Sequence, residues 1–523
     1  RPSQKIDMPN SQWVMRRVSL RDGQGNTYKT EFDYGDGYHD RLEREFYGYN
    51  RVTETHAPGT AIQRSIIQLF DNQNYYLKNM VQKTITIDKQ NHAWAMSINT
   101  YIPTLIANGS QFPELRQTET HFYDGKTYYD GDAAGNYGSR KYTYQRYLYD
   151  AYGNVTTFFD AGETGTSADD VTATISYFAD VSAYIVGKPG TIIVAGAGGR
   201  QLRKRTAQYE NTTGNLRTLT MYNTAGPNAV WNMSYHENGN LKTIADPVNY
   251  ELTYSYDDLE TATYITQIMD NFSSGDGGRY YSRARYNPLF GQMAWSRDLA
   301  GNYQVNGYDD FGRLESVHGP LDTTNAEPPA GIGVPTIAME YRAPQIAANG
   351  ETVEKPARAI THNKAVSIKG SNGNILDTVT FADGMKRILQ TKKEADVNGS
   401  HSMVISGLIV FDDLGRVDLQ GQPVPLSIGS SQVYEFNDLR TWPGQPLNPT
   451  LFTYDTLDRT LSTVMPDRAT TTMAYGFGQV GNSGALYATT LVVDPEGNRK
   501  SSYKDVAGRI MAVVEYNQGA PII

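Results

Sequence analysis

The sequence contains no cysteine among its 523 residues. Thiol catalysis and cysteine-ligated metal sites are therefore excluded, because both need the cysteine sulfur. The absence does not identify a compartment, since a chain with a large core is secreted without disulfides as well. The eight histidines are scattered and include no His-Glu-x-x-His pattern, so a zinc site has no local support.

Long apolar runs and an excess of positive charge are also missing. No stretch approaches the roughly eighteen consecutive apolar residues of a spanning helix, and we expect no membrane-spanning segment. The first residues, Arg1-Pro2-Ser3-Gln4-Lys5, are unlike a signal peptide. The net charge is -9 and the pI is about 5.5, and the one dense basic cluster, at residues 200–205, is interpreted as a solvated strand or loop. We therefore expect no nucleic-acid partner.

The chain is instead rich in tyrosine (38), glycine (49) and one repeated pattern. The pattern is an aromatic residue, an acidic residue, two variable residues, glycine, Asn or Arg, and an aliphatic residue. Repetition at this density indicates an architecture, not one special site. The residues assigned to these structural repeat turns are Tyr149, Asp150, Gly153, Asn154, Gly214, Asn215, Gly239, Asn240, Tyr308, Asp309, Gly312, Arg313, Asp412, Gly415, Arg416, Tyr454, Asp455, Gly497, Asn498, Gly508 and Arg509.

Physically, the pattern is typical of a β-hairpin connection. The aromatic residue ends one strand, where a flat ring packs well on a pleated surface. The aspartate accepts a backbone N–H two residues on, and glycine supplies the positive φ that a short hairpin loop with a bulge needs. The aliphatic residue opens the returning strand, as Leu241 does in Leu241-Lys242-Thr243-Ile244 and as Val417 does in Val417-Asp418-Leu419, where apolar residues alternate. The sequence therefore predicts an all-β chain of antiparallel hairpins in one continuous body.

Several motifs that imitate functional sites are better explained as turns. Gly476-Phe477-Gly478-Gln479-Val480-Gly481 has the letters of a dinucleotide fingerprint but precedes a loop and a strand in place of a helix. The glycines at 196–199 leave no room for a crossover to a parallel strand. Residues 130–135 open like a calcium loop, but Lys141 stands where an EF-hand needs glutamate. We expect no cofactor and no metal site, with weak surface calcium binding as the alternative at residues 130–135.

Paired carboxylates and tyrosine rows have competing interpretations. The pairs Asp257-Asp258, Asp309-Asp310 and Asp412-Asp413 resemble a glycosidase site, but all recur where the turn needs aspartate. Tyr254 and Tyr256 lie on one face of a strand, as do other tyrosines suited to stacking between neighbouring hairpins. Packing is the preferred interpretation, and a sugar-binding platform is the alternative.

The repeated Tyr-Asp and Gly-Asn/Arg pattern resembles the Rhs/YD repeat. Longer phrases resemble the middle region of the B component of bacterial Tc insecticidal toxin complexes: residues 33–49 (DYGDGYHDRLEREFYGY), 75–78 (YYLK) and 381–395 (FADGMKRILQTKKEA). The resemblance implies a long spiral strip of antiparallel β-hairpins that forms a hollow cocoon or part of one. It also implies two regions: residues 1–140, resembling the B-component middle region, and residues 141–523, a repeat strip with a less regular insertion near 322–366.

The resemblance further implies a non-enzymatic shell, secreted or at the bacterial cell surface, that encloses a C-terminal toxin polypeptide and joins other toxin-complex subunits. The absence of an initial Met and the end of the chain inside a strand predict that it belongs to a larger polypeptide. Asp494-Pro495-Glu496-Gly497 only superficially resembles the segment that cuts cargo free, so no self-cleavage residues are assigned. The alternative function is a repeat scaffold for cell-surface adhesion or host-glycan binding. The third, an enzyme, lacks a candidate site in the sequence.

Overall fold

The computed structural model describes residues 11–106, 109–129, 141–257, 262–273, 279–348, 353–365, 374–429, 432–438, 448–480, 485–517 and 520–522. Within these ranges the chain is built from antiparallel strands, with two short 3₁₀ turns, η1 (Ala197–Gly199) and η2 (Pro320–Asp322), and no α-helix. No helix in this part of the chain is long and apolar enough to cross a membrane. The predicted all-β strip of antiparallel hairpins is confirmed.

The first and larger sheet has 27 strands, and consecutive strands pair with one another. Its opening strands include the four longest described, β2, β3, β6 and β7; in order they are β1 (Arg17–Arg21), β2 (Thr27–Asp40), β3 (Glu45–His56), β4 (Arg64–Phe70), β5 (Val81–Asp88), β6 (His92–Leu105) and β7 (Gln111–Tyr128). Strand β4 alternates buried and half-buried residues, as the second half of β5 does, and strands β4 to β7 carry an apolar cluster that includes Ile67, Ile85, Met96 and Tyr123. This period-two burial is what one covered face of a sheet produces.

The middle of the first sheet consists of shorter hairpins. Strand β7 pairs directly with β8, so the sheet continues from the first of the two expected regions into the second. These strands are β8 (Lys141–Tyr149), β9 (Val155–Asp160), β10 (Val171–Asp180), β11 (Ile185–Ala195), β12 (Gln201–Tyr209), β13 (Leu216–Met221), β14 (Ala229–Tyr235), β15 (Leu241–Ala245), β16 (Glu251–Tyr256), β17 (Ile265–Ser273), β18 (Arg279–Asn287), β19 (Gln292–Arg297), β20 (Tyr303–Tyr308), β21 (Leu314–His318) and β22 (Ile337–Arg342).

The region near 322–366 interrupts this regularity. After η2 the chain forms a loop held by a bridge between Thr323 and Gly331, then β22, then a separate hairpin of β23 (Gln345–Ile346) and β24 (Val353–Lys355). The buried Lys364 anchors the loop because its ammonium contacts the Asp322 carboxylate at 2.7 Å. The first sheet then ends with β25 (Ala357–Lys364), β26 (Ile375–Ala382), β27 (Ile388–Val397), β28 (Ser400–Ile405) and β31 (Val424–Ser427).

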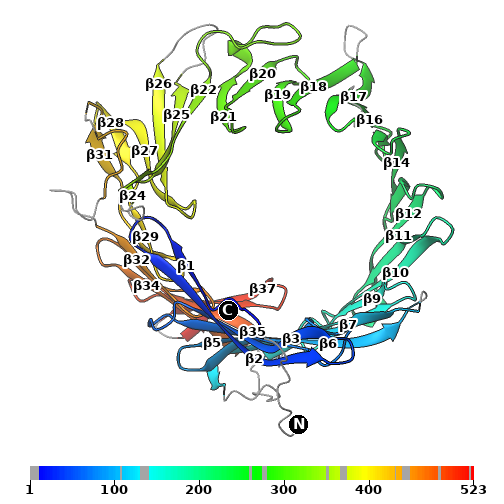
Figure 1. Ribbon diagram of the computed structural model, residues 1–523. Helices are drawn as coiled ribbons and strands as arrows, with labels where there is room; N and C mark the ends of the chain where they lie inside the picture. Colours follow the sequence, from blue (N-terminus) through cyan, green and yellow to red (C-terminus); the bar gives the residue numbers. More distant parts are fainter. Residues whose placement is uncertain are drawn as a thin grey trace.

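The chain changes sheet between β28 and β29. The second sheet has nine strands: β29 (Ile409–Phe411), β30 (Val417–Gln420), β32 (Thr450–Tyr454), β33 (Thr460–Val464), β34 (Thr470–Gln479), β35 (Leu486–Val493), β36 (Arg499–Lys504), β37 (Ile510–Asn517) and β38 (Ala520–Ile522). Figure 1 shows the first sheet curving into a ring, with the last strands of the second sheet lying beside the first strands of the first sheet. The strip therefore winds past one full turn, as a spiral does.

Candidate functional site

The repeat turn is one hydrogen-bonded unit centred on its aspartate. In the turn at 309–313, Asp309 Oδ1 accepts the N–H groups of Phe311 (3.0 Å) and Arg313 (2.9 Å), while Oδ2 accepts Arg313 Nε at 2.7 Å. Gly312 has φ +74°. The same cap, with Asn or Arg as the closing residue, is formed by Asp150, Asp298, Asp412, Asp455, Asp494 and Asp505. These carboxylates hold backbone N–H groups, which explains why the acid stands at this position.

Two of the assigned turns close without this cap. In the turn ending at Gly214-Asn215 the loop is longer, and Gly214 N–H bonds the Glu210 carbonyl. In the turn at Gly239-Asn240 the acidic position is His236, which takes part through its backbone only, and Asn240 reaches the Ala262 carbonyl at 2.6 Å. In the turn at 236–240, where histidine replaces the acid, the closing Asn240 thus bonds a neighbouring hairpin instead.

Two further capped turns were missed by the sequence reasoning. Asp22 caps the turn that ends at Asn26, and Asp383 caps the turn that ends at Arg387. Neither has the tyrosine immediately before the aspartate. The signal that would have found them is the spacing of Asp and Asn or Arg four positions apart.

Tyrosine hydroxyls tie each hairpin to the one before it. Tyr235 OH donates to the Leu216 carbonyl at 2.9 Å, and Leu216 is the residue directly after the Asn that closes the previous turn. The same relation joins Tyr177 to Val155, Tyr256 to Leu241, Tyr341 to Leu314, Tyr454 to Val417 and Tyr475 to Thr460. Tyr149 and Tyr308 make equivalent bonds to Leu115 and Met293. Burial raises the pKa of Tyr235 and Tyr454, because the phenolate is disfavoured away from water.

The two sheets meet along a contact that we call the seam. At its centre, Arg64 of the first sheet donates to Asp458 Oδ2 (2.7 Å) and to the Thr456 carbonyl (3.2 Å) of the second. In the other direction, Arg459 Nη2 lies 3.1 Å from Asp124 Oδ1, and its guanidinium lies 5.9 Å from the centre of the Trp94 ring. Each sheet thus supplies both an arginine and a carboxylate.

Further along the seam lies a buried ion pair. The Lys141 ammonium contacts the Glu163 carboxylate, and both side chains are about 95% buried (5% and 6% exposed). Both groups also bond the second sheet: Lys141 Nζ donates to the Leu486 carbonyl (2.7 Å), and the Val506 N–H donates to Glu163 Oε1 (2.8 Å). Hydrogen bonds of this kind are what make a buried pair tolerable.

The first sheet also closes on itself near its two ends. The guanidinium of Arg387 lies 3.4 Å from Asp22 Oδ2 and donates to Tyr28 OH at 2.8 Å. The Gly384 N–H donates to the Asp22 carbonyl at 2.8 Å. These bonds connect the β1–β2 turn to the β26–β27 turn, so the ring seen in Figure 1 is held by polar contacts and not by strand pairing.

Residues 432–438, which we call the strap, cover the last strands of the first sheet. Phe436 packs on Phe381 with ring centroids 5.6 Å apart. The ammonium of the fully buried Lys392 bonds the carbonyls of Gln432 and Glu435 and the side-chain oxygen of Asn437. Burial lowers the pKa of Lys392 to about 8.

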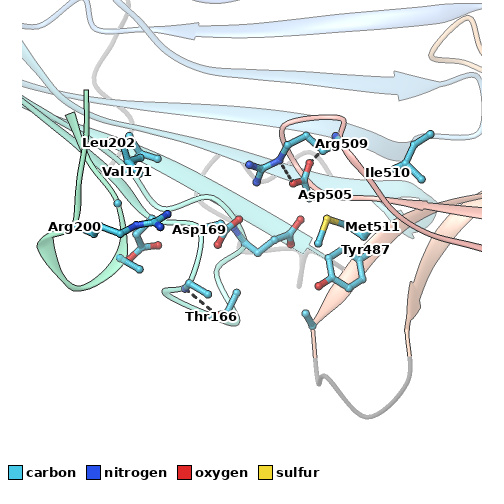
Figure 2. A pocket seen from close by; sticks show the side chains of 16 residues that line it. Thr166, Asp169, Val171, Arg200, Leu202, Tyr487, Asp505, Arg509, Ile510 and Met511 are labelled. Carbon is cyan, nitrogen blue, oxygen red and sulfur yellow. Dashed lines mark hydrogen bonds and ion pairs between the residues drawn. The ribbon is translucent and has the colours of Figure 1, made fainter. Parts of the chain in front are cut away.

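At one end of the seam, a cleft of about 770 Å³ opens between the sheets. Figure 2 shows Asp169, Val171, Arg200 and Leu202 of the first sheet on one side, and Asp505, Arg509, Ile510 and Met511 of the second on the other. Burial raises the pKa of Asp170, and the neighbouring carboxylates Asp169 and Asp160 raise it further. The cleft is therefore lined by carboxylates, by the two arginines Arg200 and Arg509, and by apolar side chains from both sheets.

The remaining sequence candidates fall in ordinary structure. Gly476 and Gly478 lie inside strand β34, and residues 196–199 make the turn around η1. Tyr286 stacks on Tyr264 (4.9 Å), and Tyr281 is flanked by two arginines. The calcium-like loop at 130–135, Gly481 and Asp258 lie outside the described residues. Among the described residues no group of three or more His, Asp and Glu side chains could hold a metal ion.

The fold and the seam together define a class: a repeat protein whose hairpins form a curved wall in overlapping layers. Comparison with known proteins gives the relatives. Residues 2–84 match the family model for the insecticide toxin TcdB middle/N-terminal region. No curated protein matches the chain.

Solved structures match over almost the whole length. The crystal structure of TcdB2-TccC3 superposes with a TM-score of 0.68 at 11% identity, covering 97% of this chain and 34% of that one. The same pair without its hypervariable C-terminal region gives 0.68 at 10% identity (95% and 35%). The Photorhabdus luminescens Tc holotoxin pore gives 0.68 at 11% identity (95% and 35%). The chain thus spans about a third of the length of these relatives.

The resemblance to the shell region of Tc toxin B components is confirmed, in sequence over residues 2–84 and in fold over nearly the whole chain. None of these relatives is named as an adhesion protein, so the adhesion alternative gains no support.

Proposed function

We propose that this chain is a wall segment of a hollow toxin shell that encloses a C-terminal toxic polypeptide and shields it until delivery. The observation that carries the proposal is the seam, which joins overlapping layers of one strip through Arg64, Asp458, Arg459 and Asp124. A wall protects its contents only if neighbouring layers are locked together. The continuous strand pairing adds to this protection, because it leaves few free sheet edges.

The wall acts by confinement and has no chemistry of its own. Its conspicuous carboxylates cap turns, as Asp309 and Asp455 do, and are engaged with backbone N–H groups. A catalytic acid or base needs a free position beside a bound substrate. We therefore assign this chain a structural, non-enzymatic role.

The partners follow from the relatives. The matched structures contain TcdB2 together with TccC3, and we propose a TccC3-like companion chain for this protein. The assembly is secreted or displayed by a bacterium, with this chain as part of a larger polypeptide.

Protease protection tests the enclosure. In the natural polypeptide assembled with its companion chain, we expect the cargo segment to be cut about 10-fold or more slowly than the same segment alone, because cleavage follows the open population. The variant Glu163→Gln removes the buried charge that pairs with Lys141 at the seam and should restore faster cleavage. Circular dichroism of the variant checks that the strands persist. Equal cleavage of the assembled and free cargo would refute enclosure.

A further inference from the structure

The docked turns of the second sheet follow one another in order along the edge of the first. The turn at 455–459 lies against Arg64, Trp94 and Asp124. The turn at 505–509 lies further on, where Val506 N–H bonds Glu163 in the loop between β9 and β10. The next turn on this edge of the first sheet, at 196–200 between β11 and β12, adjoins the cleft of Figure 2.

The walls of this cleft expose large apolar side chains, as a protein interface does when its partner is absent. Leu202 is 43% exposed on one side, and Ile510 and Met511 are 64% and 50% exposed on the other. By contrast, the apolar side chain of Leu457, at the tip of the docked turn 455–459, is half-buried by its neighbours. Large apolar side chains that gather in a cleft with a polar rim mark a protein-binding surface.

The charged groups of the cleft match those of the occupied seam. In the seam, an arginine of the first sheet (Arg64) reaches a carbonyl of the docked turn, and a carboxylate (Asp124) receives the arginine that closes that turn. In the cleft, Arg200 is exposed and has no ion-pair partner in the described part of the chain. Asp170 lines the cleft near the carboxylate of Asp169, and no arginine or lysine in the described ranges forms an ion pair with it.

We propose that this cleft binds the tip of a further repeat hairpin, with an apolar side chain between Leu202 and Met511 and a closing arginine facing Asp170. Arg200 donates to a backbone carbonyl of the bound turn, as Arg64 does to the Thr456 carbonyl in the seam. The inference rests on the proposed shell function and extends it, because it names the place and the chemistry by which another strip joins this one. The cleft continues an existing interface, which favours a hairpin over a small ligand.

A hairpin copied from this chain serves as the probe. A peptide of residues 450–464, cyclised through added terminal cysteines, contains the apolar Leu457 and the closing Arg459, and NMR establishes that it forms a hairpin. The full chain contains no cysteine, so Thr166→Cys at the cleft accepts a single fluorescent label. We expect saturable binding, weakened about 10-fold by Asp170→Asn, the equivalent of losing one paired charge. Arg459→Gln in the peptide should weaken binding to the same extent, with no further loss when both changes are combined.

The controls separate this site from general stickiness. Asp310→Asn, on an exposed turn elsewhere, should leave binding unchanged. A scrambled cyclic peptide should not bind; equal binding would show that the cleft takes any apolar chain and would overturn the proposal. Absence of saturable binding by the folded hairpin would overturn it as well.

A second measurement uses the assembled toxin polypeptide. Oxidation of Met511 by peroxide should slow about 10-fold or more relative to the isolated chain if a hairpin covers it, whereas Met385, 37% exposed in the β26–β27 turn and not part of the cleft, should oxidise at the same rate. Unchanged oxidation of Met511 would contradict the proposal. This failure would leave cargo protection intact, so it is distinguishable from failure of the shell function.

Discussion

Arg64 and Asp458 are 394 positions apart in the sequence, yet Arg64 Nη1 lies 2.7 Å from Asp458 Oδ2. Asp458 stands where other repeat turns have glycine, and its φ is +62°. Arg416 also reaches it, at 3.1 Å. The copy of the repeat that looks degenerate in sequence is therefore the one that holds the two layers together, at the cost of a backbone conformation that non-glycine residues seldom adopt.

Removing the charge of Asp458 should loosen the seam. Asp458→Asn keeps a residue that tolerates positive φ but loses both ion pairs, and because the side chain is 47% exposed we expect a loss of about 0.5–1 kcal/mol in unfolding free energy. The difference from the unmodified protein should shrink in high salt, which screens such pairs. Denaturant unfolding at two salt concentrations measures it. Asp310→Asn is the control, and an equal effect of both variants would contradict the assignment.

The tyrosine bonds between hairpins should each contribute measurably. Tyr454→Phe removes the hydroxyl that donates to the Val417 carbonyl at 2.8 Å, and the expected loss is about 1 kcal/mol. Tyr222→Phe provides a matched control, because Tyr222 is 40% exposed and makes a cation–π contact that phenylalanine preserves. Thermal unfolding of both variants tests the idea, which fails if they lose the same stability.

The turns could be predicted from the sequence because their physics is local. Asp309, Gly312 and Arg313 lie within five positions, so spacing alone indicates the cap. The seam could not be predicted, because Arg64 and Lys141 are ordinary surface-type residues whose partners in the second sheet lie more than 340 positions away. The strap was missed for the same reason. Lys392, which binds the strap, lies in strand β27. The oxygens that accept its hydrogen bonds belong to an irregular segment with no repeat pattern.

The step between the two sheets depends on one glycine. A Cβ on Gly407 would lie 1.4 Å from the carbonyl oxygen of Gly421, at the open end of the β29–β30 hairpin, where the Gly421 N–H bonds the Leu408 carbonyl. Both sides of this contact are backbone and neither can rotate away, so Gly407→Ala should cost about 3 kcal/mol or more in unfolding free energy. Gly429→Ala, which has open space around its Cβ, should cost far less. Similar stabilities of the two variants would show that the backbone can move apart where Gly407 approaches Gly421.

A buried phenol should shape the alkaline limb of stability. Tyr123 is fully buried, its hydroxyl has no partner among the described residues, and burial raises its pKa to about 12 from 10.0. The folded state keeps this proton above pH 10 while the unfolded state loses it, so stability should be constant below pH 10 and fall from pH 10 towards 12. Tyr123→Phe should be neutral or stabilising near neutrality, since no bond is lost, and should make the fall less steep. Denaturant unfolding measures the unfolding free energy across this pH range, and Tyr222→Phe, at an exposed tyrosine, is the control.

The strap should respond to pH in the opposite sense. Burial lowers the pKa of Lys392 to about 8 from 10.5, so between these values the unfolded chain holds a proton that the folded chain releases. Its contribution to stability should therefore rise with pH across this window. Lys392→Met should abolish that rise and, by removing the ammonium that donates to the Gln432 and Glu435 carbonyls and to the buried Asn437 side chain, cost about 2–4 kcal/mol near neutrality. Hydrogen exchange of residues 432–438 should accelerate in this variant and stay unchanged in Lys500→Met, whose ion pair with Glu515 is exposed and does not involve the strap. Retained protection of the strap in Lys392→Met would mean that Phe436 and the apolar contacts alone hold it.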